Sequence, residues 1–134
     1  PIGYIKSTNG WIIQDTGSSV EDAEVSLELL EKATGEKVRG HIKAIIISHT
    51  HHDHFGGTET FLKYEKEPEK IPIYAPIGYE KSMTNDNLST GIAMARRVQY
   101  QAGVFLPRDD KGYVSMGLSN TPYIPGRISS VFPN

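Results

Sequence analysis

The sequence of 134 residues contains no cysteine, which excludes both disulfide bonds and thiolate metal ligands. It also lacks an excess of positive charge, since the net charge is -2, so nothing favours nucleic acid as a partner. No apolar run approaches the roughly 20 residues of a membrane span, and we expect none. A chain without cysteine suits oxidising and reducing compartments equally. Periplasmic, secreted and cytoplasmic locations therefore all stay open.

The length and the composition of 37% hydrophobic and 22% charged residues are typical of one globular domain with a core. Two short strands are predicted within residues 3–15, around the turn dipeptide Asn9-Gly10. A helix follows, with Ser18 and Glu21 as a capping box and Gly35 as its end. Residues 42–48 are apolar except for Lys43 and Ser48 and predict a central strand buried on both faces. Strand, helix and strand indicate a parallel βαβ unit, so the predicted fold class is α/β.

Weaker patterns follow this unit. Residues 58–66 predict a short helix, and residues 71–75 predict a strand that Pro72 places near a sheet edge. Residues 79–101 have a helical pattern with a loose middle. Four carboxylates are interpreted as solvated side chains of the charged helix and loop between these segments: Glu59, Glu65, Glu67 and Glu69.

The chemistry of the chain concentrates in six consecutive residues, His49-Thr50-His51-His52-Asp53-His54, which hold four of the five histidines. Neither solvation nor turn geometry requires so many imidazoles, whereas imidazole and carboxylate are ligands that suit zinc and, less exclusively, iron or manganese. A purification tag would be terminal and uninterrupted. This cluster follows a predicted buried strand, where sites form in α/β sheets. The segment therefore predicts a metal centre.

Side chains that leave an extended strand alternate in direction, so His49 and His51 point to the same side and can share one ion. Asp53 and His54 come about a turn later and can hold a second ion or complete the first. His52 falls between the paired positions and is predicted to point outward, and the isolated His41 is interpreted as a surface residue. For Asp15, at the end of the first predicted hairpin, two roles stay open: a turn-capping acid, or a carboxylate that orients a metal-binding histidine.

This segment matches the HxHxDH signature of the metallo-β-lactamase superfamily, which the chain resembles. The resemblance implies an αβ/βα sandwich, hydrolytic chemistry and Zn2+ as cofactor, with two ions expected in the complete enzyme. By position, His49 and His51 are similar to the ligands of one zinc ion, and Asp53 and His54 to those of the other. Asp53 is also the candidate catalytic residue, expected to orient or deprotonate zinc-activated water.

A narrower resemblance, to the alkyl sulfatase branch of this superfamily, rests on residues after the signature. The matching segments are Phe55-Gly56-Gly57, Tyr74-Ala75-Pro76, Asn87, Ala93-Met94-Ala95-Arg96-Arg97, Tyr100-Gln101-Ala102-Gly103 and Leu106-Pro107. That branch hydrolyses alkyl sulfate esters, which releases inorganic sulfate and an alcohol. Arg96, Arg97 and Tyr100 are the candidate substrate-binding residues, because guanidinium groups hold tetrahedral oxyanions well. Neighbours on a helix cannot both face one site, so at most one arginine is expected to contact sulfate.

Each zinc ion needs about three protein ligands, and no histidine follows His54 to complete the two pairs. We therefore expect residues 1–134 to be the N-terminal half of a catalytic domain and to be inactive when isolated. The resemblance also implies a homodimer formed through a domain outside this chain. Two alternatives remain: another hydrolase of the same fold, acting on a thioester, lactam, lactone or phosphodiester, and a non-catalytic metal-binding fragment.

Overall fold

The computed structural model describes residues 1–115 and 126–134. The chain divides into two compact units, and each is described by itself. The first unit joins Pro1–Tyr79 to the C-terminal segment, and the second begins at Glu80. All of the histidines belong to the first unit.

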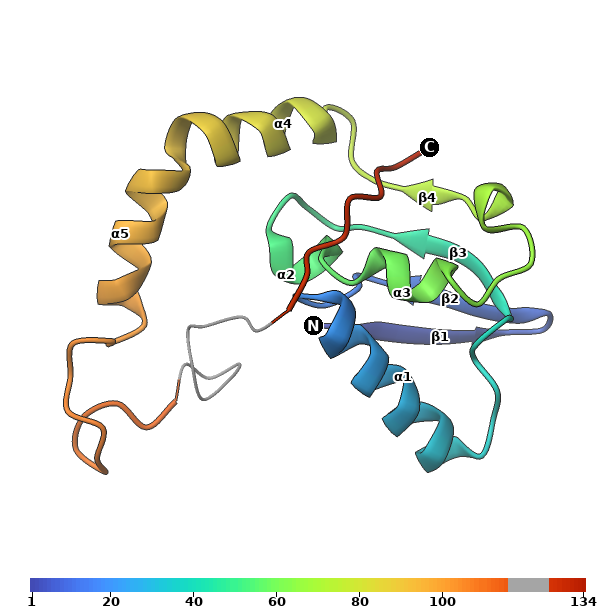
Figure 1. The fold of residues 1–134 in the computed structure, drawn as a ribbon, viewed down its shortest axis with the longest axis horizontal. Coiled ribbons are helices and arrows are strands. Elements are labelled where there is room, and N and C mark those ends of the chain that lie inside the picture. The colour runs from blue at the N-terminus through green and yellow to red at the C-terminus, as the bar shows by residue number, and fades with distance from the viewer. Residues whose placement is uncertain (116–125) are drawn as a thin grey trace. The chain divides into compact units, whose positions relative to one another are not determined.

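A four-stranded sheet forms the centre of the first unit (Figure 1). Its strands β1 (Gly3–Ser7), β2 (Gly10–Gln14), β3 (Ile42–Ile46) and β4 (Ile73–Tyr74) lie in that order across the sheet. β1 and β2 form an antiparallel hairpin, whereas β2, β3 and β4 run parallel. The predicted parallel βαβ unit is therefore confirmed, and β4 lies at an edge, as Pro72 indicated.

The helix α1 (Val20–Thr34) connects β2 to β3 and ends at Gly35, whose φ of 70° is the left-handed conformation that glycine adopts most readily. Its N-cap is Ser19, whose side chain accepts a hydrogen bond from the backbone of Asp22. The predicted capping box of Ser18 and Glu21 was thus wrong by one residue. The short helix α3 (Thr58–Leu62) packs beside α1 and ends before the predicted position 66.

Within the described residues of the first unit, helices cover one face of the sheet only (Figure 1). On the covered face, the neighbouring residues Ile13, Ile45 and Ile73 are at most 4% exposed. On the other face, Ile46 and its neighbour Tyr74 are 38% and 60% exposed. The prediction that β3 is buried on both faces was therefore wrong for this chain, which forms one helix-covered sheet layer of the expected sandwich.

The C-terminal residues 126–134 return to the first unit and cross it to the edge strand β4 (Figure 1). The backbone N–H of Ser129 donates to the carbonyl of Gly56 at 2.7 Å, and its Oγ accepts from the backbone N–H of Glu59 at 3.2 Å. The side chain of Asn134 accepts from the backbone N–H of Ile73 at 2.8 Å. These contacts tie the segment that follows the histidines to the end of the chain.

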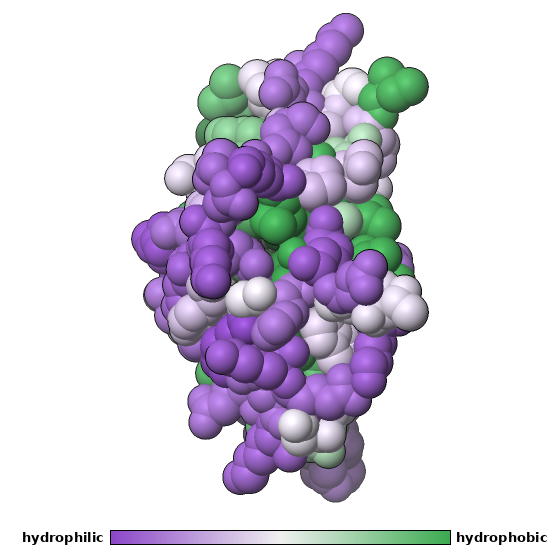
Figure 2. All heavy atoms as spheres, turned by 90° about the vertical axis from the view of Figure 1, so that its right-hand side faces the viewer, coloured by the Kyte–Doolittle hydropathy of each residue, from purple (hydrophilic) through white to green (hydrophobic). Residues whose placement is uncertain are grey.

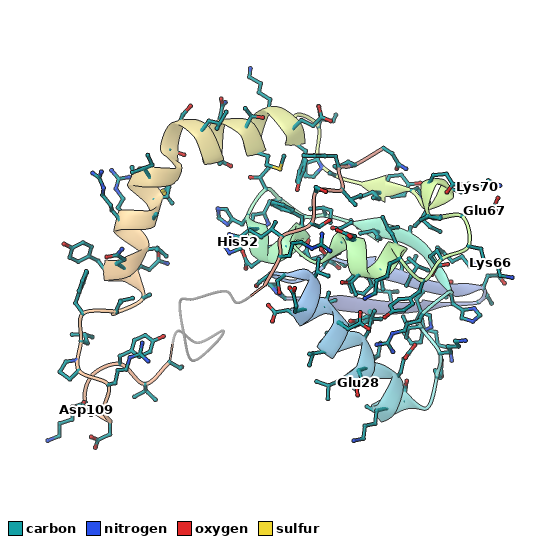
Figure 3. All side chains as sticks on the ribbon, in the orientation of Figure 1. Glu28, His52, Lys66, Glu67, Lys70 and Asp109 are labelled. Carbon is teal, nitrogen blue, oxygen red and sulfur yellow. The ribbon has the colours of Figure 1, made fainter. Side chains whose placement is uncertain are left out.

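The side of the molecule with the turn between β1 and β2 is mainly hydrophilic (Figure 2). Exposed charged residues on this side include Lys66, Glu67 and Lys70, which Figure 3 labels. Glu67 precedes the 3-10 turn η1 (Pro68–Lys70) and forms an ion pair with Lys70, the last residue of the turn. This polar surface matches the solvated loop that the sequence predicts there.

Apart from Tyr79, the first residue of α4, the second unit contains two helices, α4 (Tyr79–Asn85) and α5 (Gly91–Gln101), joined by a π-helical turn over Asp86–Thr90. The predicted helix with a loose middle is therefore confirmed. α5 has no buried residue. Among the described residues, no helix is long and apolar enough to cross a membrane.

Candidate metal centre

The histidine cluster lies where the parallel strands β2 and β3 end. The backbone N–H of Asp15, the residue after β2, donates to the carbonyl of Ile46, the last residue of β3, at 2.8 Å. Beyond β3 the chain continues through Ser48 and His49 into the short helix α2 (His52–Phe55). Parallel strands bring their carboxyl ends to one edge, so two segments distant in the sequence meet here.

Asp15 is 7% exposed and accepts three hydrogen bonds at this edge. Its Oδ1 accepts from the backbone N–H of Ser48 at 2.7 Å, and its Oδ2 accepts from the Ser48 hydroxyl and from Nδ1 of His54, both at 2.9 Å. Its φ of 57° is the one positive value among the non-glycine residues that the structure describes. Aspartate tolerates this region better than most residues, though at a strain of about 1 kcal/mol. Of the two roles considered for Asp15, the structure supports orientation of a histidine.

The side chains of the four predicted metal ligands form two pairs. Nε2 of His49 lies 3.1 Å from Nδ1 of His51, and Oδ2 of Asp53 lies 3.3 Å from Nε2 of His54. The pairs adjoin, because the ring centres of His49 and His54 are 3.9 Å apart. Two ligands of a tetrahedral zinc ion, each about 2.0–2.1 Å from it, lie about 3.3 Å from one another. Each pair therefore has the spacing and the donor types that one ion requires.

Within residues 1–115 and 126–134, no three side chains of the ligating types converge on one point. Each ion placed at a pair would thus find two of the roughly three protein ligands that zinc takes. The donors are also accessible, since His51 is exposed and His49, Asp53 and His54 are half-buried. The residues fit zinc as two half-sites.

Burial and hydrogen bonding set the protonation of two groups here. Burial opposes ionisation of Asp15, but hydrogen bonds from His54 and Ser48 outweigh it and hold its pKa below the usual value. Burial, and then the neighbouring imidazoles of His54 and His51, lower the pKa of His49. A carboxylate and a neutral imidazole are the forms that a metal site needs.

Two glycines allow the chain to pass tightly behind the histidines. A Cβ atom at Gly56 would lie 2.1 Å from the carbonyl oxygen of Ser18, and one at Gly57 would lie 2.2 Å from that of Thr16. Thr16 also donates its backbone N–H to the carbonyl of His54 at 2.8 Å. Backbone contacts that no larger residue permits thus fix the segment bearing the ligands.

The remaining residues singled out in the sequence are two further histidines and the candidate substrate-binding residues. His52 is exposed on α2, in agreement with its outward prediction (Figure 3), and His41 is exposed before β3. Arg96, Arg97 and Tyr100 are exposed on α5, in the second unit, and their role in substrate binding stays a prediction.

The interpretation of Glu65 as merely solvated was wrong, since its carboxylate accepts a hydrogen bond from the backbone N–H of Ile42 at 2.9 Å.

Two residues of the candidate metal centre were not predicted from the sequence. Ser48 contacts Asp15 and two histidines, and its position next to the signature was the available signal. Tyr79 packs edge-on against Phe55, with ring centres 6.4 Å apart, and burial followed by the charge of Asp15 raises its pKa to about 12. Nothing in the local sequence indicated the contact between Tyr79 and Phe55.

The family model of the metallo-beta-lactamase superfamily matches residues 2–123. The chain belongs to this superfamily. It is 34% identical, over 97% of its length, to an (R)-specific secondary-alkylsulfatase from Pseudomonas sp., and 34% identical, over 85%, to an alkyl/aryl-sulfatase of Saccharomyces cerevisiae. The solved structure of the stereoselective inverting sec-alkylsulfatase Pisa1 from Pseudomonas sp. matches 99% of the chain with a TM-score of 0.78 and 32% identity.

These matches cover 19%, 17% and 21% of the three relatives, so the chain spans about a fifth of their length. The predicted resemblance is confirmed, and so is the fold class, as part of a metallo-beta-lactamase fold.

Proposed function

We propose that this chain is part of a zinc-dependent hydrolase of alkyl sulfate esters, which releases inorganic sulfate and an alcohol. The observation that carries the proposal is the pairing of ligand atoms, at 3.1 and 3.3 Å, in a chain similar to alkylsulfatases over nearly its whole length. His49 and His51 hold one ion, and Asp53 and His54 hold the other. Zinc there supplies the Lewis acidity that activates water for attack on the ester.

The side chains of this segment have distinct tasks in the proposed reaction. Asp53 is half-buried beside His54, where its carboxylate orients the attacking water or accepts a proton from it. Asp15 holds Nδ1 of His54 and so directs Nε2 toward the ion. Arg96 or Arg97, together with Tyr100, binds the sulfate group, for which a guanidinium is a suitable partner.

The remaining metal ligands belong, in this proposal, to the protein beyond the described residues. Two donors per ion bind zinc weakly, so residues 1–134 alone are proposed to be inactive. A homodimer through a further domain belongs to the same proposal. Hydrolysis of alkyl sulfates by the isolated residues 1–134 would contradict the proposal that this fragment is inactive.

The test uses the full-length protein that contains this chain, loaded with zinc. We expect release of inorganic sulfate from dodecyl sulfate, and two zinc ions per chain by elemental analysis. His49→Ala should lose zinc and activity, whereas the matched variant His52→Ala, whose side chain is exposed on the same segment, should retain both. No sulfate release by the wild type, or preference for a thioester, lactam, lactone or phosphodiester in a substrate panel, would overturn the proposed substrate.

A further inference from the structure

The hydroxyl of Ser48 lies at the centre of the site, between both pairs of ligands. Its Oγ is 2.9 Å from Oδ2 of Asp15, 2.9 Å from Nδ1 of His49 and 3.2 Å from Nδ1 of His54. This one hydroxyl therefore contacts two histidines of the signature as well as Asp15. Ser48 itself immediately precedes the first ligand.

Donor and acceptor chemistry assigns the hydrogens on the imidazole Nδ1 atoms that face Ser48 and Asp15. The carboxylate of Asp15 has no proton to give, so the Ser48 hydroxyl donates its single hydrogen to Oδ2. The same oxygen then has only lone pairs left for His49, whose Nδ1 must carry a hydrogen and donate it. Nδ1 of His54 likewise donates to the Asp15 carboxylate at 2.9 Å. Each imidazole therefore has its hydrogen on Nδ1.

A neutral imidazole protonated at Nδ1 presents an unprotonated Nε2, which is the form that binds a metal. These Nε2 atoms belong to different pairs, since that of His49 faces His51 and that of His54 faces Asp53. One hydroxyl and one carboxylate thus select the same tautomer in both half-sites. At the first pair, an ion would replace the hydrogen that His51 now donates to His49, which leaves His51 protonated on Nε2.

We infer that Ser48 is a positioning residue, which holds His49 in the metal-binding tautomer and joins this ligand to the Asp15–His54 pair. This inference rests on the proposed metal centre and deepens it. Asp15 by itself can fix the tautomer of His54, which it contacts directly. The Ser48 hydroxyl, by contrast, bridges Asp15 and His49. Ser48 is exposed, so water competes for these hydrogen bonds and limits the size of the effect.

The first measurement is the tautomer of each histidine in the metal-free protein, by long-range 1H–15N correlation NMR at about pH 8, above the reference imidazole pKa of about 6.5. The wild type should have His49 and His54 protonated on Nδ1. In Ser48→Ala, His49 should shift largely to the Nε2-protonated form, because its acceptor is gone, whereas His54 should not change. A wild-type His49 protonated on Nε2 would overturn the inference without any variant.

The second measurement is zinc affinity by competition with a chelator. Ser48→Ala should weaken binding about 10-fold, at the lower end of the effect of removing such partners. Ser48→Thr retains a hydroxyl and should restore both the tautomer and the affinity. The matched control Ser26→Ala removes a hydroxyl on α1 that accepts from Tyr4 at 2.9 Å, and it should leave zinc binding unchanged.

An unchanged His49 tautomer and zinc affinity in Ser48→Ala, or no rescue by Ser48→Thr, would overturn the role of Ser48 even if the enzyme hydrolyses alkyl sulfates. Conversely, Ser48-dependent tautomers and zinc affinity in a protein that releases no sulfate would support this inference and overturn the proposed substrate. Failure of one proposal is therefore distinguishable from failure of the other.

Discussion

Nδ1 of His54 lies 2.9 Å from Oδ2 of Asp15, although 39 residues separate the two in the sequence. The contact joins the end of β2 to the helix that follows β3. It places a carboxylate behind one histidine of the signature and leaves the other ring nitrogen free to face Asp53. A carboxylate behind a metal-binding imidazole fixes the orientation of the ring and makes it a stronger ligand.

Replacement of this carboxylate should weaken the metal site without unfolding the chain. Asp15→Asn retains an oxygen for the backbone of Ser48 and tolerates the positive φ, but it loses the charge that holds His54. We expect zinc affinity to fall about 10- to 100-fold, measured by chelator competition. Asp109→Asn, in an exposed loop of the second unit, is the control and should bind zinc as the wild type does.

A methyl group at Gly57 should destabilise the first unit. Its Cβ would lie 2.2 Å from the backbone oxygen of Thr16 and 2.5 Å from Cβ of Ala23, so the backbone must move. We expect Gly57→Ala to lower the free energy of unfolding by about 2–4 kcal/mol, measured by urea denaturation. Gly35→Ala meets no atom within 4 Å and strains only φ, so it should lose about 1 kcal/mol. Equal losses in the two variants would contradict the steric explanation.

The ion-pair cluster around Glu24 should make stability depend on acid pH. Burial opposes ionisation of this carboxylate, but hydrogen bonds from Lys63, Tyr64 and Arg39 outweigh it and lower its pKa to about 2. Because the folded-state pKa lies below the usual 4.5, the stabilisation is complete above about pH 4.5 and is lost as the pH falls toward 2. Thermal unfolding across this range checks the prediction.

Glu24→Gln tests the same cluster at neutral pH. It should lower the free energy of unfolding by about 1–2 kcal/mol at pH 7 and flatten the acid dependence, since the charge that attracts Arg39 and Lys63 is gone. Glu28 is exposed on the same helix α1 (Figure 3), so Glu28→Gln is the matched control. A control that loses as much stability as Glu24→Gln would assign the effect to the helix rather than to the cluster.

The adjacent arginines of α5 should differ in their effect on substrate binding. Neighbouring helical positions point about 100° apart, so at most one of Arg96 and Arg97 is expected to contact sulfate. Alanine at that position should raise KM for dodecyl sulfate about 10- to 100-fold, the loss of one charge-assisted hydrogen-bonding group. Alanine at the other position is its control. If KM is unchanged in both variants, neither arginine binds the sulfate group.

Local patterns predicted the parts of the fold that local interactions determine. The Asn9-Gly10 turn, the apolar residues of β3 and the end of α1 at Gly35 each depend on a few consecutive residues. The burial of β3 on both faces was predicted from its hydrophobicity, but the described helices of the first unit cover one face. Hydrophobicity shows which surface a strand can bury, whereas the elements packed against it decide which surface is buried.

The sequence by itself determined the chemistry of the candidate centre. His49, His51, Asp53 and His54 are close along the chain, so the alternation of an extended segment and one short helical turn suffices to pair their side chains. Only the tertiary structure decided what surrounds these pairs. Asp15 reaches Ser48 and His54 because β2 and β3 end at the same edge of the sheet, and such long-range contacts have no signature in either segment alone.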